Sequence, residues 1–176
     1  MKRRKKESPF VLAAFTIVAG ALIGGSVLIM NELPSQVIHQ TTRAASLGDA
    51  ETFQSDNLRF SIELPKSFQK SVGVQYVDFI NSSGTIHATR ITTNFSTLAD
   101  YLYEFDSRRK IEVSDEKSLS IDGYTAVSRI EKYGDMQKEE KVYNIFIDGW
   151  VYSLSTTSTA LYKNIDQIAQ TFRYLP

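Results

Sequence analysis

The chain has no cysteine, only 2 histidines and only 1 tryptophan among its 176 residues. The absence of cysteine excludes disulfides, thiol nucleophiles, zinc–thiolate sites and a lipid-modified cysteine. The folded part contains one histidine, so a histidine-rich metal site cannot be built there. We therefore expect a domain that is held together by its apolar core alone.

Long apolar runs are also scarce, with one exception at residues 10–30, FVLAAFTIVAGALIGGSVLIM, which contain no charged side chain. As a helix this run spans about 31 Å at roughly 1.5 Å per residue, close to the bilayer's hydrocarbon thickness of about 30 Å. Basic residues occupy positions 2–6, and such a cluster stays in the cytoplasm. We expect residues 1–9 to be a basic cytoplasmic tail, residues 10–30 a transmembrane helix, and the remainder extracytoplasmic.

Two interpretations of this run compete, a cleaved signal peptide and an uncleaved signal anchor. The run exceeds the roughly 7–15 apolar residues of a signal peptide, and the nearest cluster of small residues, 44–46, lies well beyond Met30. These features favour a single-pass anchor that contacts the lipid bilayer through residues 10–30. Gly20 and Gly24 stand four apart within it, a spacing that lets two helices approach closely, so a homodimer through these glycines is an open alternative.

Charge is divided unevenly along the chain. The first ten residues carry five basic groups and one acidic group, which leaves 15 basic and 19 acidic groups, a net charge of −4, for the rest. A mildly acidic domain has no bias toward nucleic acid. Residues 31–57 are rich in Thr, Ser, Ala, Gln and Asp and predict a flexible linker. The folded domain is expected to cover residues 58–176.

Alternating apolar residues and turn signals predict an antiparallel sheet in this domain. Residues 58–64 alternate apolar and polar side chains until Pro65, as a half-buried strand does. An Asn-Ser-Ser-Gly turn separates residues 74–80 from 85–92, which predicts a hairpin. Asp-Gly and Gly-Asp dipeptides predict further turns. A short segment at 111–113 is followed by expected strands at residues 118–121, 124–133, 137–147 and 150–156, and these dipeptides separate the last four.

Two amphipathic helices are expected to cover the sheet, because neither can stand alone. Residues 97–109 place Leu98, Leu102 and Phe105 in one apolar stripe, and Ser96 or Asn94 is expected to cap the first turn. A second helix, residues 161–172, has a stripe of Leu161, Ile165, Ile168 and Phe172. The fold class is therefore α+β, an antiparallel sheet packed by helices.

Three stretches carry a resemblance to a known family. They are LRFSIELPKSF at 58–68, IDGYTAV at 121–127, and GWVYSLSTTS at 149–158 followed by the helix that ends in TFR at 171–173. Together they resemble the PsbP-like family, which takes its name from an extrinsic subunit of photosystem II and has bacterial relatives of unassigned role. The resemblance implies a PsbP-like α/β/α sandwich over residues 58 to about 175.

The lone histidine of the domain, His87, is a candidate general base on a predicted strand. A general base needs a hydrogen-bonded partner and a nucleophile within reach, and no Gly-x-Ser-x-Gly elbow supplies a serine. We expect His87 to be a partly exposed strand histidine with no catalytic role.

Carboxylates are the remaining candidates for chemistry. Asp100, Glu104 and Asp106 lie close together on a predicted helix and offer oxygen ligands to a hard cation, but the loop spacing of a calcium site is missing. Solvated charges paired with Arg108 or Arg109 are the favoured interpretation. Two further acidic pairs lie at 115–116 and 139–140, and the second pair points to opposite faces of a strand. No catalytic, cofactor or metal site is therefore assigned.

Aromatic residues have two readings, either core packing or the lining of a ligand groove, and core packing is favoured. The residues concerned are Tyr101, Tyr103, Tyr143, Tyr152, Tyr162 and Trp150. Altogether the sequence predicts a membrane-anchored, extracytoplasmic binding or assembly module with a protein partner and without enzymatic activity. The alternatives are a metal-dependent or hydrolytic enzyme that uses carboxylates, and a membrane-tethered sensor or regulator.

Overall fold

The computed structural model describes residues 47, 49–134 and 138–176. The chain divides into two units at residues 40 and 41, and every described residue belongs to the second unit. The predicted tail, membrane span and Gly20–Gly24 pair lie outside the described residues. Within the described ranges, no helix is both long enough and apolar enough to cross a membrane.

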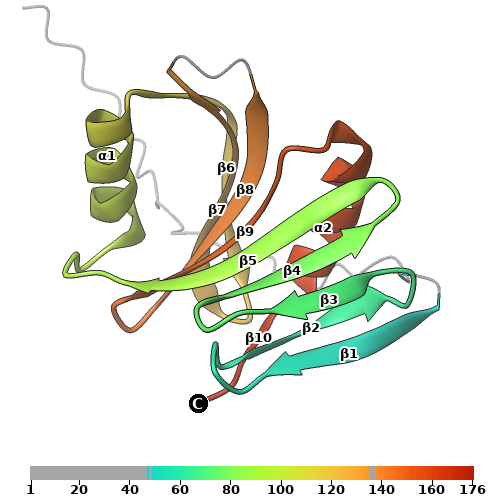
Figure 1. The fold of residues 1–176 in the computed structure, drawn as a ribbon. Helices are drawn as coiled ribbons and strands as arrows, with labels where there is room; N and C mark the ends of the chain where they lie inside the picture. Colours follow the sequence, from blue (N-terminus) through green and yellow to red (C-terminus); the bar gives the residue numbers. More distant parts are fainter. Residues whose placement is uncertain (1–46, 48, 135–137) are drawn as a thin grey trace, which may run out of the picture. The chain divides into compact units, whose positions relative to one another are not determined.

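A seven-stranded sheet in the order β3-β4-β5-β9-β8-β7-β6 forms the centre of the domain (Figure 1). Every neighbouring pair is antiparallel, which confirms the prediction from the turn dipeptides. The strands are β3 (Gln69–Val72), β4 (Tyr76–Asn81), β5 (Gly84–Thr92), β6 (Ile111–Ile121), β7 (Tyr124–Tyr133), β8 (Glu139–Ile147) and β9 (Trp150–Thr156).

Several predicted strand boundaries differ from the structure, including the strand expected at 58–64, which is observed at Phe60–Pro65. The segment predicted as one strand from residue 74 contains the end of a short loop after β3, and β3 itself was not predicted because its four residues are all exposed. The two short segments predicted around residues 111 and 118 form the single strand β6. Its pairing shifts register between Ser114 and Lys117, where Asp115 adopts a positive φ of 51°, and this irregularity interrupts the apolar alternation.

A second, three-stranded sheet consists of β1 (Ala50–Ser55), β2 (Phe60–Pro65) and β10 (Arg173–Tyr174) in the order β1-β2-β10. The folded domain thus begins earlier than expected, because β1 lies in the segment predicted as linker. Phe53 of β1 packs against Phe60 and Phe79, with ring centroids 6.2 and 5.1 Å away. One apolar residue in a polar stretch gives no detectable period, so only pairing with β2 reveals this strand.

Both predicted helices are present. They are α1 (Leu98–Arg109) and α2 (Tyr162–Gln170), the second preceded by a short 3₁₀ turn, η1 (Thr159–Leu161). Thr97, rather than Ser96 or Asn94, caps α1, and its Oγ1 accepts a hydrogen bond from the Asp100 amide at 3.1 Å. Lys110 ends the helix in the left-handed region, with a φ of 53°.

The helices lie on opposite faces of the large sheet (Figure 1). Val127 and Val151 face α1, whereas their strand neighbours Ala126 and Tyr152 belong to the cluster on the other face, because successive side chains alternate across a sheet. The α2 face is also covered by the three-stranded sheet. The predicted α/β/α layering is therefore present, with an additional small sheet.

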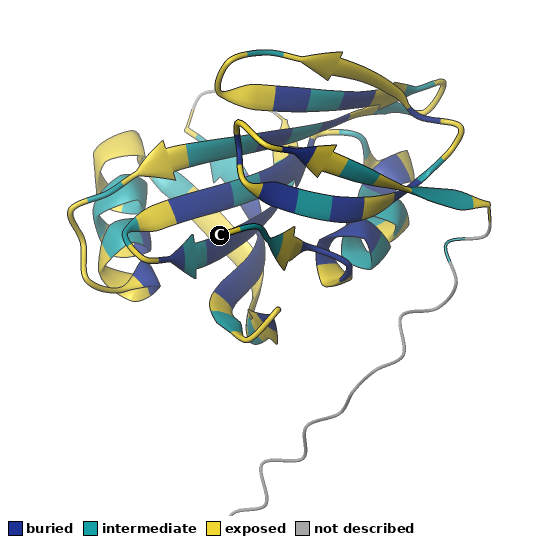
Figure 2. Cartoon of the chain, turned by 90° about the horizontal axis from the view of Figure 1, so that it is seen from below, coloured by how far each residue is buried: buried dark blue, intermediate teal, exposed yellow. Residues whose placement is uncertain are grey.

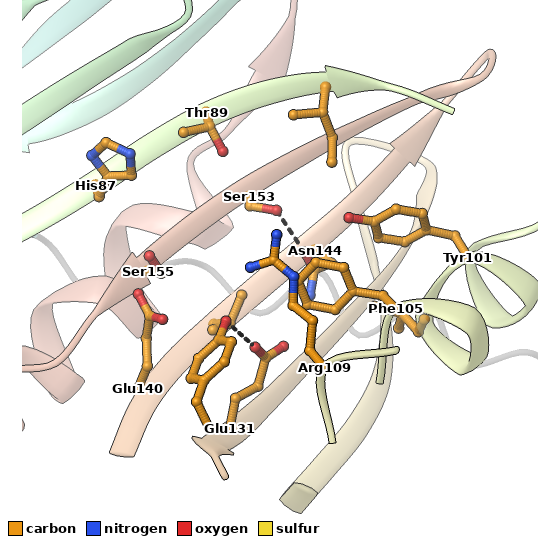
Figure 3. A pocket seen from close by; sticks show the side chains of 14 residues that line it. His87, Thr89, Tyr101, Phe105, Arg109, Glu131, Glu140, Asn144, Ser153 and Ser155 are labelled. Atoms are coloured by element: carbon orange, nitrogen blue, oxygen red, sulfur yellow. Dashed lines mark hydrogen bonds between the residues drawn. The ribbon is translucent and has the colours of Figure 1, made fainter. Parts of the chain in front are cut away.

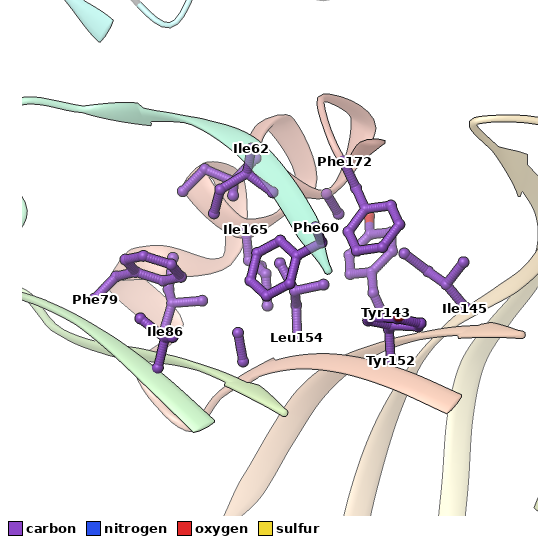
Figure 4. Packing of buried hydrophobic residues seen from close by; sticks show 14 of the residues in the cluster. Phe60, Ile62, Phe79, Ile86, Tyr143, Ile145, Tyr152, Leu154, Ile165 and Phe172 are labelled. Carbon is purple, nitrogen blue, oxygen red and sulfur yellow. The ribbon is translucent and has the colours of Figure 1, made fainter. Parts of the chain in front are cut away.

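The main core lies between the large sheet, α2 and the small sheet (Figure 4). Phe60 stacks on Phe172 at 5.5 Å, and Tyr152 meets Phe172 edge-on at 5.3 Å. The predicted stripe of the second helix is buried at all four positions. Figure 2 shows how buried and exposed bands alternate along the strands. The α1 face carries only a small apolar cluster, of Leu98, Leu102, Val127 and Val151.

Candidate functional site

The face of the large sheet that carries α1 is covered only in part. Helix α1 contacts β6, β7 and β8, whereas no described helix or second sheet packs on this face of β3, β4 and β5. Three large apolar side chains there are exposed, namely Tyr76, Ile80 and Ile91. This open face therefore combines accessible apolar groups with the polar residues of β5 and β9.

A hollow of about 380 Å³ lies where the open face meets α1 (Figure 3). Strands β5, β7, β8 and β9 form its floor, and α1 forms one wall. Its size falls within the range of about 300–1,000 Å³ that is usual for small-molecule sites. The residues that line it include His87, Thr89, Tyr101, Phe105, Arg109, Glu131, Tyr133, Glu140, Asn144, Ser153 and Ser155.

A buried charge network supports the wall of the hollow. Arg129 of β7 is 1% exposed and binds Asp106 of α1 through two hydrogen bonds, of 2.8 and 2.6 Å. Its Nε donates to Glu131, which is 2% exposed, at 2.8 Å, and Glu116 lies 3.6 Å away. Buried charges are tolerated when they are paired and hydrogen-bonded. Arg129 thereby fastens α1 to the sheet and holds Glu131 in place.

Tyr133 completes this network at the edge of the hollow. Its hydroxyl donates a hydrogen bond of 2.8 Å to the second carboxylate oxygen of Glu131. Burial and this bond to Glu131 raise the pKa of Tyr133, Glu140 raises it further, and Arg109 opposes the rise. Arg109, Tyr133 and Glu140 all line the hollow.

The floor of the hollow has a buried amide at its centre. Asn144 is 4% exposed, and its Oδ1 accepts a hydrogen bond of 2.6 Å from Ser153 on the neighbouring strand. No hydrogen bond from its Nδ2 to another described residue is present. Asn144 lines the hollow (Figure 3), and its Nδ2 is a hydrogen-bond donor that is not fully buried.

Aromatic rings form the wall contributed by α1. Tyr101 stacks on Phe105 at 5.7 Å, and Phe95 from the preceding loop meets Tyr101 at 6.3 Å. The guanidinium of Arg109 lies 4.8 Å from the centre of the Phe105 ring, as in a cation–π contact. The three residues of the predicted apolar stripe therefore have two different environments. Leu98 and Leu102 are buried, whereas Phe105 lines the hollow.

His87 is a half-buried strand residue, as predicted. Its Nδ1 contacts the carboxylate of Asp78 on β4, and its ring stacks on Tyr76 at 5.5 Å. On its other side, Ser155 of β9 is the register partner of His87. The structure thus brings an acid, a histidine and a serine together on adjacent strands, although no hydrogen bond between Ser155 and His87 is present among the described residues.

Replacing His87 with alanine should leave the fold and the cellular role intact. Asp78 is itself partly exposed, so its carboxylate is hydrated when the histidine is gone, and exposed pairs contribute about 0–1 kcal/mol. Thermal melting and a cellular assay measure the two effects. A His87→Ala protein that folds normally but loses its function would overturn the prediction.

The carboxylates of α1 do not converge on one point. Asp100 accepts a hydrogen bond from Thr97 at 2.7 Å, Glu104 pairs with Arg108, and Asp106 binds Arg129. Over the described ranges, no three His, Asp or Glu side chains are placed to hold a metal ion. The favoured interpretation of paired charges is correct for Glu104, but Asp106 has a buried partner from another element.

The other predicted acidic pairs also separate. Asp115 lines a polar hollow on the opposite face of the sheet, whereas Glu116 approaches Arg129. Glu139 lines that same opposite hollow, and Glu140 lines the one beside α1. The expectation that neighbouring residues 139 and 140 point to opposite faces is confirmed.

The predicted aromatic set divides between core and surface. Tyr152 and Tyr143 are buried, and burial together with a hydrogen bond to Asp166 raises the pKa of Tyr143. Tyr101 lines the hollow. The remaining members lie apart from it: Tyr103 is exposed, Tyr162 lies beside the opposite hollow, and Trp150 stacks with Arg90 at 4.3 Å.

Sequence reasoning missed Arg129, Glu131 and Asn144. A signal was available for the first two, because opposite charges two positions apart on an otherwise apolar strand must share a face. A strand that buries both faces tolerates such charges only as a pair. Asn144 gave no signal of its own, since its importance depends on which strand lies beside it.

Comparison with solved structures shows which known fold this chain shares. The chain is similar to cyanobacterial PsbP from Synechocystis sp. PCC 6803, with 12% identity, a TM-score of 0.51 and coverage of 74% of this chain and 96% of that chain. It is also similar to a protein from Bacteroides thetaiotaomicron VPI-5482, with 15% identity, a TM-score of 0.53 and coverage of 73% and 50%. No family model and no curated protein matches the sequence. The fold is therefore PsbP-like, as the three sequence stretches predicted.

Proposed function

We propose that this protein is a binding or assembly module of the cell envelope, anchored in the membrane by residues 10–30 with its domain outside the cytoplasm. Its partner is a protein that contacts the open face of the large sheet. The observation that carries this proposal is the accessible group of Tyr76, Ile80 and Ile91 on a sheet face that also contains a preformed polar hollow. Tyrosine is enriched among the residues that contribute most to binding at interfaces, and grouped exposed apolar side chains mark interaction sites.

The arrangement of charged groups supports binding rather than catalysis. The most deeply buried charges, Arg129 and Glu131, are used to hold α1 and the floor of the hollow in place. A rigid, preorganised site of this kind favours recognition, because the protein loses less conformational entropy when a partner binds.

Site-specific photocrosslinking in intact cells tests this proposal. A photoreactive residue is placed at Ile80 on the open face or, as the matched control, at Glu63, which is exposed on β2 of the small sheet. We expect one discrete protein adduct from position 80 and none from position 63. Adducts of the same kind from both positions, or from neither, would contradict an interface on the open face.

A second prediction concerns the anchor. The protein isolated from membranes should have its full mass of 19.9 kDa, because the apolar run is longer than a cleaved signal peptide requires. Intact-mass measurement of the membrane fraction checks this. A mass that is lower by about 3–5 kDa, the mass of the first 25 to 46 residues, would show that a signal peptide has been cleaved. The proposed membrane anchor would then be wrong.

One observation favours an enzyme as the alternative, namely the order Asp78, His87 and Ser155 across three adjacent strands. In a hydrolase the histidine would take the serine proton while the aspartate orients it. Hydrolysis of an activated ester that disappears in both His87→Ala and Ser155→Ala proteins would support this alternative. Hydrolysis that is unchanged in either variant would exclude it.

A further inference from the structure

Two opposite charges face the hollow without pairing to each other. Arg109 lies on the α1 wall over Phe105, and Glu140 projects from β8. Neither side chain forms an ion pair with a described residue, although ten other pairs are present. Both side chains line the hollow together with Tyr133.

The side-chain amide of Asn144 lines the same hollow. The Nδ2 of Asn144 has no acceptor among the described residues, while the residue is only 4% exposed. This nitrogen is not fully buried, since the buried side-chain atoms without a partner among the described residues are the hydroxyls of Tyr152 and Tyr162. A ligand that enters the hollow with an acceptor oxygen can therefore accept a hydrogen bond from it. The hollow thus offers a cation, an amide donor and an anion together, beside an aromatic wall.

We propose that this hollow binds a small zwitterion of the amino-acid or short-peptide type. Its carboxylate is bound by Arg109 and the Asn144 amide, and its ammonium group is bound by Glu140. Apolar parts of the ligand lie against Phe105 and Tyr101. The inference builds on the assignment of this face as the binding surface, but it names a ligand that binds independently of the protein partner.

The charge pattern explains why a zwitterion is preferred over a simple ion. A simple anion would meet Glu140 and the buried Glu131, and a simple cation would meet Arg109. A ligand that carries both charges satisfies both ends, and charge-assisted hydrogen bonds are about twice as strong as neutral ones. The aromatic wall adds contact area for a side chain.

Calorimetric titration of the folded domain, beginning at Leu47, tests the proposal. The probes are L-alanyl-L-phenylalanine, its N-acetyl derivative, which lacks the ammonium group, and its C-terminal amide, which lacks the carboxylate. We expect the free dipeptide to bind about tenfold or more tightly than either blocked form, since one charged hydrogen bond is worth about 1.5–3 kcal/mol. L-Phenylalanine is titrated in parallel.

The chain supplies matched control variants at adjacent positions. Glu140→Gln should abolish the preference over the N-acetyl form, whereas Glu139→Gln, on the opposite face, should keep it. Arg109→Gln should abolish the preference over the amide, whereas Arg108→Gln, on the exposed side of α1 and paired with Glu104, should keep it.

Three outcomes would overturn the inference. They are no binding of either free probe at about 10 mM, equal affinity for free and blocked forms, and equal loss in the adjacent control variants. Any of these, found together with a discrete adduct at position 80, would contradict zwitterion binding and leave the proposed protein-binding role supported. Dipeptide binding without an adduct at position 80 would support the zwitterion site and contradict the protein-binding role.

Discussion

Replacing Arg129 with alanine is expected to lower the free energy of unfolding by about 3–5 kcal/mol, the usual cost of removing one partner from a buried ion pair. Arg129 is 1% exposed and provides hydrogen bonds to both Asp106 and Glu131. Without it, the carboxyl group of Glu131 is left in a buried site without its cationic partner, and α1 loses its polar link to β7. Chemical denaturation followed by circular dichroism measures the change.

Two controls separate buried charge from lost packing. Arg108→Ala removes a side chain of the same kind that is 76% exposed and pairs with Glu104, and it should cost no more than about 0.5 kcal/mol. The double variant Arg129→Met, Glu131→Leu removes both charges while it keeps the volume, and it should recover most of the loss. If Arg129→Ala were as mild as Arg108→Ala, the buried network would not hold α1.

Removing β1 is expected to destabilise the domain about as strongly as the Arg129→Ala substitution. A domain that begins at Leu58, the boundary predicted from sequence, lacks Ala50–Ser55, which pairs along its whole length with β2. It also loses the contacts of Phe53 with Phe60 and Phe79. Phe53 is only partly buried, but its loss together with the hydrogen-bonded pairing of the whole strand uncovers one side of the main core, so we expect a broad, non-cooperative melt.

The matched comparison is a domain that begins at Leu47, which retains β1 and the pair of Asp49 with Lys66 at 2.7 Å. We expect it to be monomeric in light scattering and to melt in one sharp transition. A domain that begins at Glu51 keeps all but one residue of β1 and should behave in the same way. Equal melting temperatures for the Leu47 and Leu58 domains would mean that β1 contributes nothing to the core.

The two predictions concern opposite sides of the large sheet. Arg129 acts between the sheet and α1, next to the hollow, whereas β1 acts on the side that contains the main core. We therefore expect an Arg129 variant to lose ligand and partner binding before it unfolds. The β1 deletion should instead unfold the whole domain.

The sequence by itself determined most of the local structure. The Asp-Gly pairs at 122–123 and 148–149 sit at turns because both positions adopt positive φ, as Asp148 and Gly149 do at 47° and 78°. Strand and helix positions followed from side-chain periods of 2 and 3.6, which depend only on neighbours along the chain. The PsbP-like topology followed from the same short stretches.

Only the tertiary structure decided which distant residues meet. Strand β1 exists because β2 offers it a hydrogen-bonding edge, and its own polar sequence gives no pattern. The pairing of His87 with Ser155 and the link from Arg129 to Asp106 join elements that are not consecutive along the chain. Such contacts depend on which non-consecutive elements pack side by side, and the local pattern of side chains does not specify this.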